Sequence, residues 1–345
     1  MSHDIDLDKY KIRTDLLIDT IEASKEKIDV LVDKRKDDDI AITVVDVDKK
    51  QEQSIGKKAG RYITIEFVDV TDHDNKEKLI NVFKKELKEL LNHLKINDDF
   101  TCLVIGLGND SSTPDALGPT VVKDIIVTKH LFELNEVEDG FREVSALSPG
   151  VMGTTGIETG DIIEAVVKKI KPDFLLIIDA LASQSIARVN KTIQMSDSGI
   201  NPGSGVGNKR KEISKEKLGI PVIAIGVPTV VDAATIVSET INYLYKHVSY
   251  YKKNLNNPRN RLIKPGSINY MKDNNLNLLD DKEKITLLGL LGELTDEEMK
   301  RLIYEVLSPI GYNLMVTPKE IDFLIIKLSE VLAKGINGAL HKKVT

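Results

Sequence analysis

Apolar and polar residues follow two different patterns along this chain, one typical of strands and the other of helices. Two strand-like runs are expected at 40–47 and 62–70, separated by a turn rich in glycine and lysine. Over 76–94 the apolar residues return every three or four positions opposite a charged face, which predicts a helix. Before these runs, the first 37 residues mix charges with scattered apolar positions, which is typical of a leader and a short, loosely attached helix.

Beyond residue 100 the pattern changes to continuous apolar strands that alternate with helices. Strands are expected at 101–107, 173–180 and 220–227, and helices at 113–131, 160–170, 229–246, 295–307 and 318–335. Such strands indicate a sheet covered on both faces. The sequence therefore predicts an α/β fold with a mostly parallel twisted sheet and helices on both faces. The asparagine-rich stretch at 250–283 predicts a surface excursion.

Acidic residues stand at the ends of two of the apolar strands. Asp179 directly follows the run LLII, and Asp115 lies in the loop TPDALGP after the strand at 101–107. Ligands of open α/β sheets bind at the carboxyl ends of the strands, and a buried carboxylate is costly unless it is paired or protonated. Taken singly, Asp115 has the plainer explanation of a helix cap, whereas for Asp179 the binding of loop amides and a catalytic role are equally supported. Taken together, the two acids favour a catalytic pair that shares one proton.

Two glycine-rich loops are candidates to approach a peptide substrate. Gly106 and Gly108 follow the first of these strands, and Gly203, Gly205 and Gly207 lie in the run NPGSGVGNKRKEIS. The run at 201–214 lacks the spacing of a phosphate-binding or dinucleotide-binding motif, so the signal for nucleotides is weak. The backbone amides of both loops are candidate donors to an oxyanion.

Composition and charge exclude several classes of protein. The 345 residues carry a net charge of −6, which argues against a general nucleic-acid surface. No stretch approaches the roughly 18 apolar residues that cross a membrane, and the charged N-terminus is unlike a secretory signal. Cys102 is the only cysteine, and none of the six histidines has metal-ligand spacing. We therefore expect a cytoplasmic protein without metal, other cofactor, nucleic-acid partner or membrane partner.

Eight longer motifs, spread over nearly the whole chain, carry a resemblance. They are RTDL at 13–16, GKKAGRYITIE at 56–66, IGLGN and TPDALGP within 105–119, SPGVMGTTGIET at 148–159, IIDALA at 177–182, SDSGINPGSGVGNKRKEIS at 196–214, IPVIAIGVPTVVDA at 220–233 and NLMVTPKEID at 313–322. Together they resemble the spore germination endopeptidase family. The resemblance implies an atypical aspartic endopeptidase whose fold is similar to that of the hydrogenase maturation endopeptidases.

The same resemblance implies a substrate, an assembly and a precursor. It implies an enzyme of the forespore and spore core that begins the degradation of small acid-soluble spore proteins at germination. It also implies a homotetramer, made as a self-processing zymogen. The family's two implicated acids correspond to Asp115 and Asp179, and its precursor bond to Asp15–Leu16. Residues 1–15 would then be an inhibitory propeptide, and 16–345 a single α/β peptidase domain.

Two other functions remain open from the sequence. One is a metal-binding maturation endopeptidase of the same fold, in which the two acids would be ligands; the lack of a third histidine ligand at a strand end counts against it. The other is a binding module without catalysis, against which the presence of both acids argues.

Overall fold

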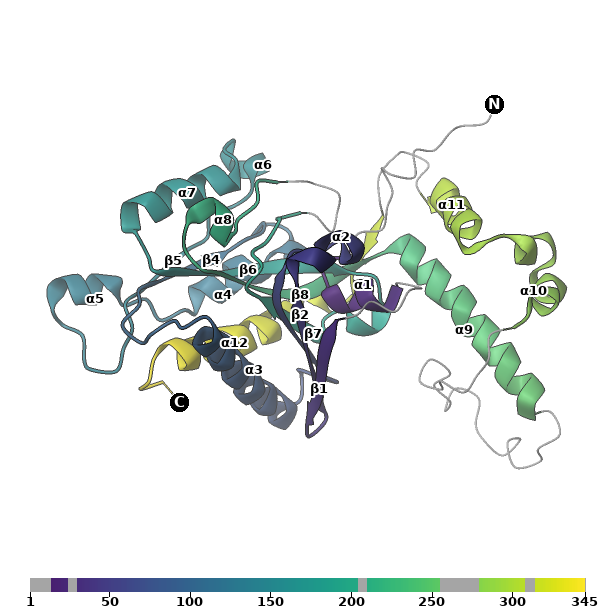
Figure 1. Cartoon of the computed structure of the whole chain (residues 1–345), viewed down its shortest axis with the longest axis horizontal. Helices are drawn as coiled ribbons and strands as arrows, with labels where there is room; N and C mark the ends of the chain where they lie inside the picture. The colour runs from purple at the N-terminus through teal and green to yellow at the C-terminus, as the bar shows by residue number, and fades with distance from the viewer. Residues whose placement is uncertain (1–13, 24–29, 204–209, 255–278, 308–313, 345) are drawn as a thin grey trace. The chain divides into compact units, whose positions relative to one another are not determined.

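The computed structural model describes residues 14–23, 30–203, 210–254, 279–307 and 314–344. Their contacts divide into two compact units. One unit consists of the described residues up to Val231 together with those from Thr317 onward, and the other lies between Asp232 and Val316. Figure 1 shows the elements of both.

The larger unit is built on a mixed sheet with the strand order β1-β2-β3-β7-β8-β6-β4-β5 (Figure 1). The strands are β1 (Leu31–Asp37), β2 (Ile40–Val47), β3 (Gly60–Glu66), β4 (Cys102–Gly106), β5 (Val144–Leu147), β6 (Phe174–Ser183), β7 (Thr192–Ser196) and β8 (Val222–Asp232). β5, β4, β6 and β8 pair in parallel, whereas β8, β7, β3, β2 and β1 pair antiparallel. The predicted α/β class is confirmed, but these eight strands form a mixed rather than a mostly parallel sheet, with three parallel and four antiparallel pairs. The parallel pairs belong to the half of the sheet whose strands are joined through helices.

One face of the sheet carries the main apolar core. Alternate strand residues, among them Ile65, Val104, Ile178 and Ile225, pack there against three helices. The helices are α3 (His73–His93), α4 (Leu117–Lys123) and α12 (Ile321–Leu340). The apolar stripes that predicted helices at 76–94 and 318–335 are the ones buried here by α3 and α12, so both predictions are confirmed. We refer to this side as the α3 face.

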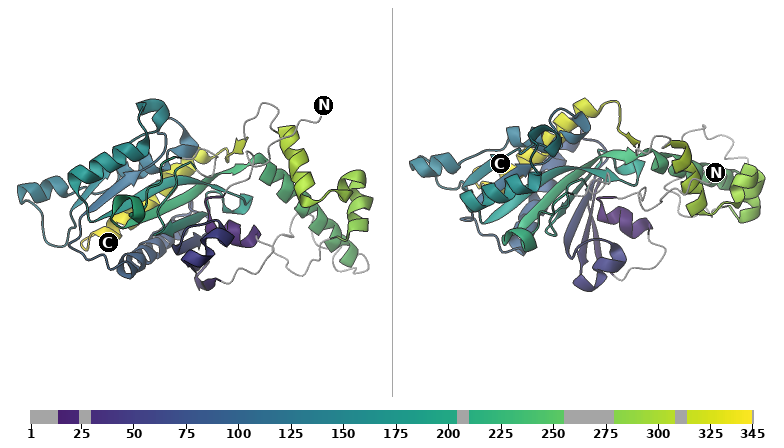
Figure 2. Two further views of the ribbon diagram at one scale, coloured as in Figure 1. Left: turned by 45° about the horizontal axis from the view of Figure 1, so that its top comes forward. Right: turned by 90° about the horizontal axis from the view of Figure 1, so that it is seen from above.

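The opposite face of the same strands is covered in two parts. α7 (Thr159–Ile170) packs with Leu103 of β4 and Ile177 of β6. α1 (Leu17–Ala23) and α2 (Glu52–Ile55) contribute Leu17 and Ile55 to a cluster with Tyr62 of β3. We refer to this side as the α7 face, and Figure 2 shows helices on both sides of the sheet.

The expected helix at 113–131 is wrong, because the structure breaks it into three pieces. These are η2 (Thr113–Asp115), α4 and α5 (Lys129–Leu134). Distant groups bind the amides that a continuous helix would use internally: Ile126 N donates to Asn337 Oδ1 at 2.9 Å, and Thr128 N donates to the Val144 carbonyl at 2.9 Å. Tertiary hydrogen bonds therefore override the local pattern.

Two further expectations are corrected. β1 lies within the stretch that the sequence assigned to a leader with a short helix; its residues are mostly exposed, and its antiparallel pairing with β2 holds it. The helix expected from 229 begins instead at Ala233, because β8 extends to Asp232 beside β6. Short elements complete this unit: η1 (Lys49–Gln51), α6 (Met152–Thr155), η3 (Ile186–Arg188) and α8 (Lys215–Leu218).

The smaller unit is mostly helical. Its elements are α9 (Ala233–Asn254), α10 (Asp281–Leu288), η7 (Gly289–Glu293), α11 (Asp296–Leu307) and β9 (Met315–Val316). Ala234 and Ile303 form the centre of its apolar cluster. α11 confirms the helix expected at 295–307. Of the expected excursion at 250–283, residues 255–278 lie outside the described residues.

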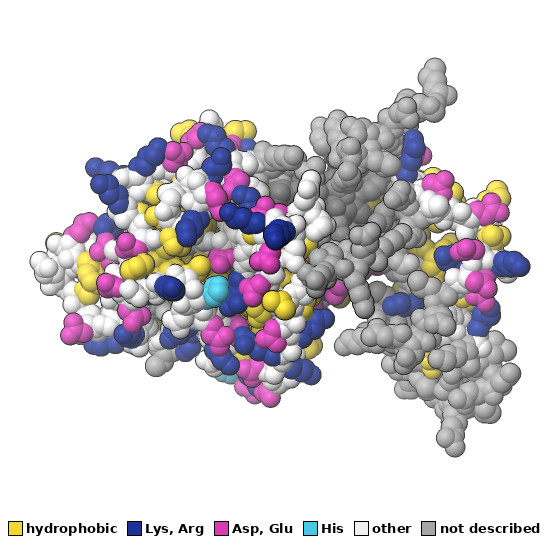
Figure 3. Space-filling view, in the orientation of Figure 1, with side chains coloured by type: hydrophobic (Ala, Val, Ile, Leu, Met, Phe, Trp, Pro, Cys, Tyr) yellow, Lys and Arg dark blue, Asp and Glu magenta, His cyan; other side chains and the backbone are white. Residues whose placement is uncertain are grey.

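The surface of the described residues carries both signs of charge. On the face drawn in Figure 3, lysine and arginine side chains are interspersed with aspartate and glutamate. Among the described residues, no helix has the length and apolar character needed to cross a membrane.

Candidate active site

Asp179 is carried by β6 to the carboxyl end of the parallel strands. The preceding residue, Ile178, belongs to the α3 face, so Asp179 is directed to the α7 face by strand alternation. It is only 7% exposed, and its Oδ1 accepts a hydrogen bond of 3.0 Å from the Ala180 amide. A carboxyl group therefore occupies a buried position at the sheet edge where α/β proteins bind ligands.

Asp115 follows the neighbouring strand, β4, and closes the short turn η2. Its Oδ2 accepts a hydrogen bond of 2.9 Å from the Asn109 amide, and its carbonyl oxygen accepts one of 3.0 Å from the same amide. The helix-cap explanation is not supported, because α4 begins after Ala116 without a side-chain cap. The carboxylate is instead positioned by the loop in front of it.

Two of the expected substrate-loop glycines allow this loop to close. Gly108 has a φ of +118°, and a Cβ there would lie 1.9 Å from the Asp115 carbonyl oxygen. A Cβ on Gly106 would lie 2.2 Å from the Gly118 carbonyl oxygen. Larger residues would force the strand end away from η2 and α4. Gly203 is described, with a φ of +71°, whereas Gly205 and Gly207 lie outside the described residues.

The charge of Asp115 acts on Asp179. Burial raises the pKa of Asp179 well above its usual range, and the negative charges of Asp115 and Asp15 raise it further. Burial also raises the pKa of Asp115, although the hydrogen bond from Asn109 opposes this shift. The structure therefore brings together both predicted catalytic residues in a setting where one proton is readily retained.

Residues 14–17 bind across the same region. Asp15 N donates to the Ala182 carbonyl at 3.1 Å, and Ala182 N donates to Asp15 Oδ2 at 2.9 Å. Lys57 Nζ donates to the Thr14 carbonyl at 2.6 Å. Burial lowers the pKa of Lys57, whereas the charges of Asp15 and Asp19 raise it. The segment is thus held by its backbone and by charge beside the end of β6.

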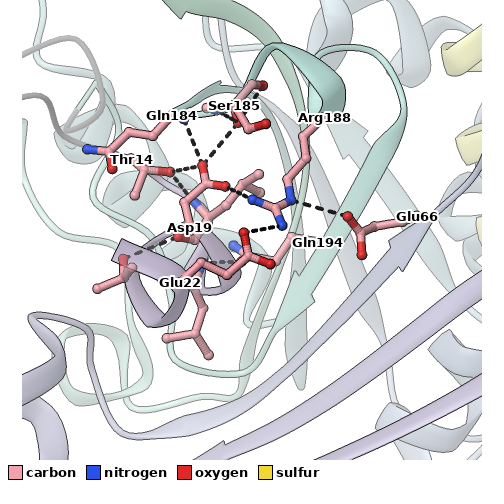
Figure 4. Close-up of polar contacts among 12 residues, drawn as sticks. Thr14, Asp19, Glu22, Glu66, Gln184, Ser185, Arg188 and Gln194 are labelled. Atoms are coloured by element: carbon pink, nitrogen blue, oxygen red, sulfur yellow. Dashed lines mark hydrogen bonds and ion pairs between the residues drawn. The ribbon is translucent and has the colours of Figure 1, made fainter. Parts of the chain in front are cut away.

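A buried ionic cluster anchors the residues that follow. Asp19, 4% exposed, pairs with Arg188, and its Oδ2 also accepts hydrogen bonds from Thr14 Oγ1, Ser183 Oγ and the Gln184 amide (Figure 4). Burial would lower the pKa of Arg188, but its carboxylate neighbours raise it. These neighbours include Glu22 at 2.7 Å and Glu66 at 3.2 Å.

The predicted cleavage bond, Asp15–Leu16, marks a change from polar to apolar contacts. Leu16 is 0% exposed and packs with Ile18 and Leu181, and Leu17 belongs to the cluster around Tyr62. Leu16, Leu17 and Ile18 are therefore part of the core of the larger unit, whereas Thr14 and Asp15 are held mainly through polar contacts.

Residues 11–345 match the sequence profile of the germination protease family. The chain belongs to this family. It is 50% identical to the germination protease of Bacillus velezensis and 49% identical to that of Priestia megaterium; each alignment covers 100% of this chain and 97% of the relative. The chain is therefore a peptidase.

A comparison with solved structures finds a [NiFe] hydrogenase maturation protease, HycI, from Thermococcus kodakarensis. The two chains are 20% identical, with a TM-score of 0.28 over 41% of this chain and 80% of the other.

Among the described residues of this germination protease family member, no three His, Cys, Asp or Glu side chains form a group that could hold a metal ion.

Four polar residues of this region were not predicted from the sequence. They are Asp19, Lys57, Arg188 and Gln194. None belongs to a catalytic motif, and each is an ordinary charged or polar residue in its local context. The alternation of Ile193, Gln194 and Met195 is a signal for a half-buried strand, but it does not tell a buried glutamine from a solvent-exposed one.

Proposed function

We propose that this peptidase is an atypical aspartic endopeptidase in which Asp115 and Asp179 act as one catalytic pair. The supporting observation is that Asp115 follows β4 and Asp179 lies in the neighbouring parallel strand β6, where it is buried near the charge of Asp115. Two like charges in one buried site do not both ionise readily, so the pair holds a single proton over a wide pH range. A general acid and a general base are then present together.

The environment of each acid suggests its role. Asp179 is the more deeply buried and carries the proton, while Asp115 is the base. Asp115 takes a proton from a water molecule as the water oxygen bonds to the substrate carbonyl carbon, and Asp179 gives its proton to the carbonyl oxygen. The gem-diol then collapses: Asp115 passes its proton to the leaving nitrogen as the C–N bond breaks, and Asp179 regains a proton from a diol hydroxyl.

The peptidase is further proposed to be a zymogen that cleaves its own Asp15–Leu16 bond. The contacts of Asp15 with the end of β6, and the effect of its charge on Asp179, support this assignment. Residues 1–15 would be the inhibitory propeptide and 16–345 the mature enzyme; residues 1–13 lie outside the described residues. Processing should become faster as the pH falls from neutral, because a larger fraction of the pair then holds its proton.

The family resemblance supplies the remaining parts of the proposal. The substrates are small acid-soluble spore proteins, cleaved at germination in the spore core after synthesis of the enzyme in the forespore. The peptidase assembles as a homotetramer, so light scattering of the unprocessed protein would detect a mass four times the 38.3 kDa of one full chain.

One experiment tests the catalytic type. The full chain is incubated with a small acid-soluble spore protein, with and without a chelator, and the fragments are followed by mass spectrometry. Cleavage that resists the chelator supports the acid pair. Chelator-sensitive cleavage would favour a metal-binding maturation peptidase instead, and an intact substrate would favour a binding module.

A further inference from the structure

Gln194 binds the backbone on both sides of the predicted cleavage bond. Its Nε2 donates to the Asp15 carbonyl oxygen at 3.2 Å, and its Oε1 accepts a hydrogen bond of 2.7 Å from Leu17 N. In cleavage of the Asp15–Leu16 bond, water would attack the carbonyl carbon of Asp15. The glutamine therefore holds the reacting carbonyl and the amide of the second residue after the bond.

The sheet places Gln194 in the same row as Asp179. Gly226 of β8 pairs with Asp179 of β6 on one side and with Gln194 of β7 on the other. Residues paired across neighbouring strands point to the same face, so Asp179 and Gln194 both project on the α7 face. The residue between them, Gly226, has no side chain. A Cβ at Gly226 would lie 2.4 Å from Cδ1 of Leu181, so the glycine makes room for the leucine against which Leu16 packs.

The burial of Gln194 indicates that a peptide belongs at this position. Gln194 is only 8% exposed, and a buried amide side chain is costly when its donor and acceptor are unpaired. Both of the side-chain hydrogen bonds described above go to the backbone of residues 15–17. Departure of residues 1–15 would remove the Asp15 carbonyl, the partner of Nε2, and leave this buried donor available to the carbonyl of another peptide.

We propose that Gln194 is a catalytic residue that stabilises the negative charge developing on the scissile carbonyl oxygen and sets the register of residues 15–17 for self-cleavage. This inference rests on the proposed cleavage of Asp15–Leu16. The Nε2–H group donates to the carbonyl oxygen throughout, and this bond strengthens as negative charge develops on the oxygen. Gln194 exchanges no proton: the proton that reaches the oxygen comes from Asp179. Its Oε1 requires an N–H group on the second residue after the cleaved bond.

The first test replaces Gln194 in the full chain. Gln194→Glu keeps the shape and the acceptor but removes the donor, so we expect kcat to fall about 10²–10³-fold, with a smaller change in KM. Gln194→Ala removes both contacts, so the release of residues 1–15 should slow at least as much. Thermal unfolding of each variant reports whether the fold is kept. The reactions followed are release of residues 1–15 and turnover of a separate protein substrate.

The second test leaves Gln194 intact and changes the bound segment. Leu17 is the first residue of α1, a position where helices accept proline, so Leu17→Pro removes the N–H group without an internal helix break. Leu17→Ala is the matched control, because it loses the same buried side chain but keeps the N–H group. We expect the proline variant to release residues 1–15 at least about 10-fold more slowly than the alanine variant, as a lost buried hydrogen bond implies.

The outcomes separate this inference from the proposed function. Wild-type turnover by Gln194→Glu, or equal processing of Leu17→Pro and Leu17→Ala, would overturn the role of Gln194 while the acid pair stands. A wild-type chain that cleaves neither itself nor the substrate would overturn both. Loss of kcat in Gln194→Glu together with slow processing of Leu17→Pro supports the assignment.

Discussion

The two faces of the sheet are made by the same strands but have opposite character. On the α3 face, residues such as Ile178 and Ile225 form one continuous apolar core with α3, α4 and α12. On the α7 face, the apolar packing is interrupted by Asp179, Gln194 and the Asp19–Arg188 pair, all of them buried. Burying such groups is costly unless they are paired, and hydrogen bonds or ion pairs to each of them offset that cost here. The buried polar groups on which the proposed chemistry depends therefore lie on the α7 face of the sheet.

The largest expected effect is the loss of catalysis when either acid is neutralised. Asp115→Asn and Asp179→Asn should each lower kcat about 10²–10⁴-fold, and the double variant should lose little more, because the pair acts as a unit. Turnover of a protein substrate measures this. Asp232→Asn is the matched control, since Asp232 is also buried with a raised pKa but binds the Ala234 amide at the start of α9. Near wild-type turnover in either single variant would contradict the pair.

A second expected effect concerns the anchor of the N-terminal segment. Arg188→Met leaves Asp19 buried without its cation, which should lower the free energy of unfolding by about 3–5 kcal/mol. Arg61→Met is the control: Arg61 pairs with Asp46 at 2.7 Å but both side chains are partly exposed, so the loss should be about 1 kcal/mol or less. Denaturant unfolding measures both. Equal losses would show that the polar cluster on the α7 face contributes no more than a surface pair.

The smallest expected effect is a dependence of stability on pH. The folded state raises the pKa of Asp179, so the stability from this group is full below its unfolded pKa and is lost as the pH rises through its folded pKa. Asp179→Asn removes the cost of ionising a buried carboxyl group. The variant should therefore gain stability relative to the wild type between acidic and neutral pH, in denaturant melts at a series of pH values. A difference that stays constant with pH would show that Asp179 ionises as freely in the folded as in the unfolded chain.

Much of the apolar framework could be predicted from local patterns. Period-two and continuous apolar runs located β2, β4, β6 and the first part of β8, and the helical period located α3, α7 and α12. The two acids were found because each lies at or just beyond the end of an apolar run. Asp179 directly follows the run LLII, where another apolar residue is expected, and Asp115 lies in the loop after the run at 101–107. Local patterns failed at β1 and at the break after Asp115, where hydrogen bonds to distant residues decide the outcome.

The sequence by itself determined the α/β framework, the two acids at its strand ends and the membership of a peptidase family, because these are written in short stretches of chain. Only the tertiary structure decided which polar residues meet around them. Gln194 binds Asp15 across 179 residues of sequence, and Arg188 pairs with Asp19 across 169. Whether a polar side chain is buried depends on which distant segments pack against it in the fold, and the residues next to it in the sequence do not determine that contact.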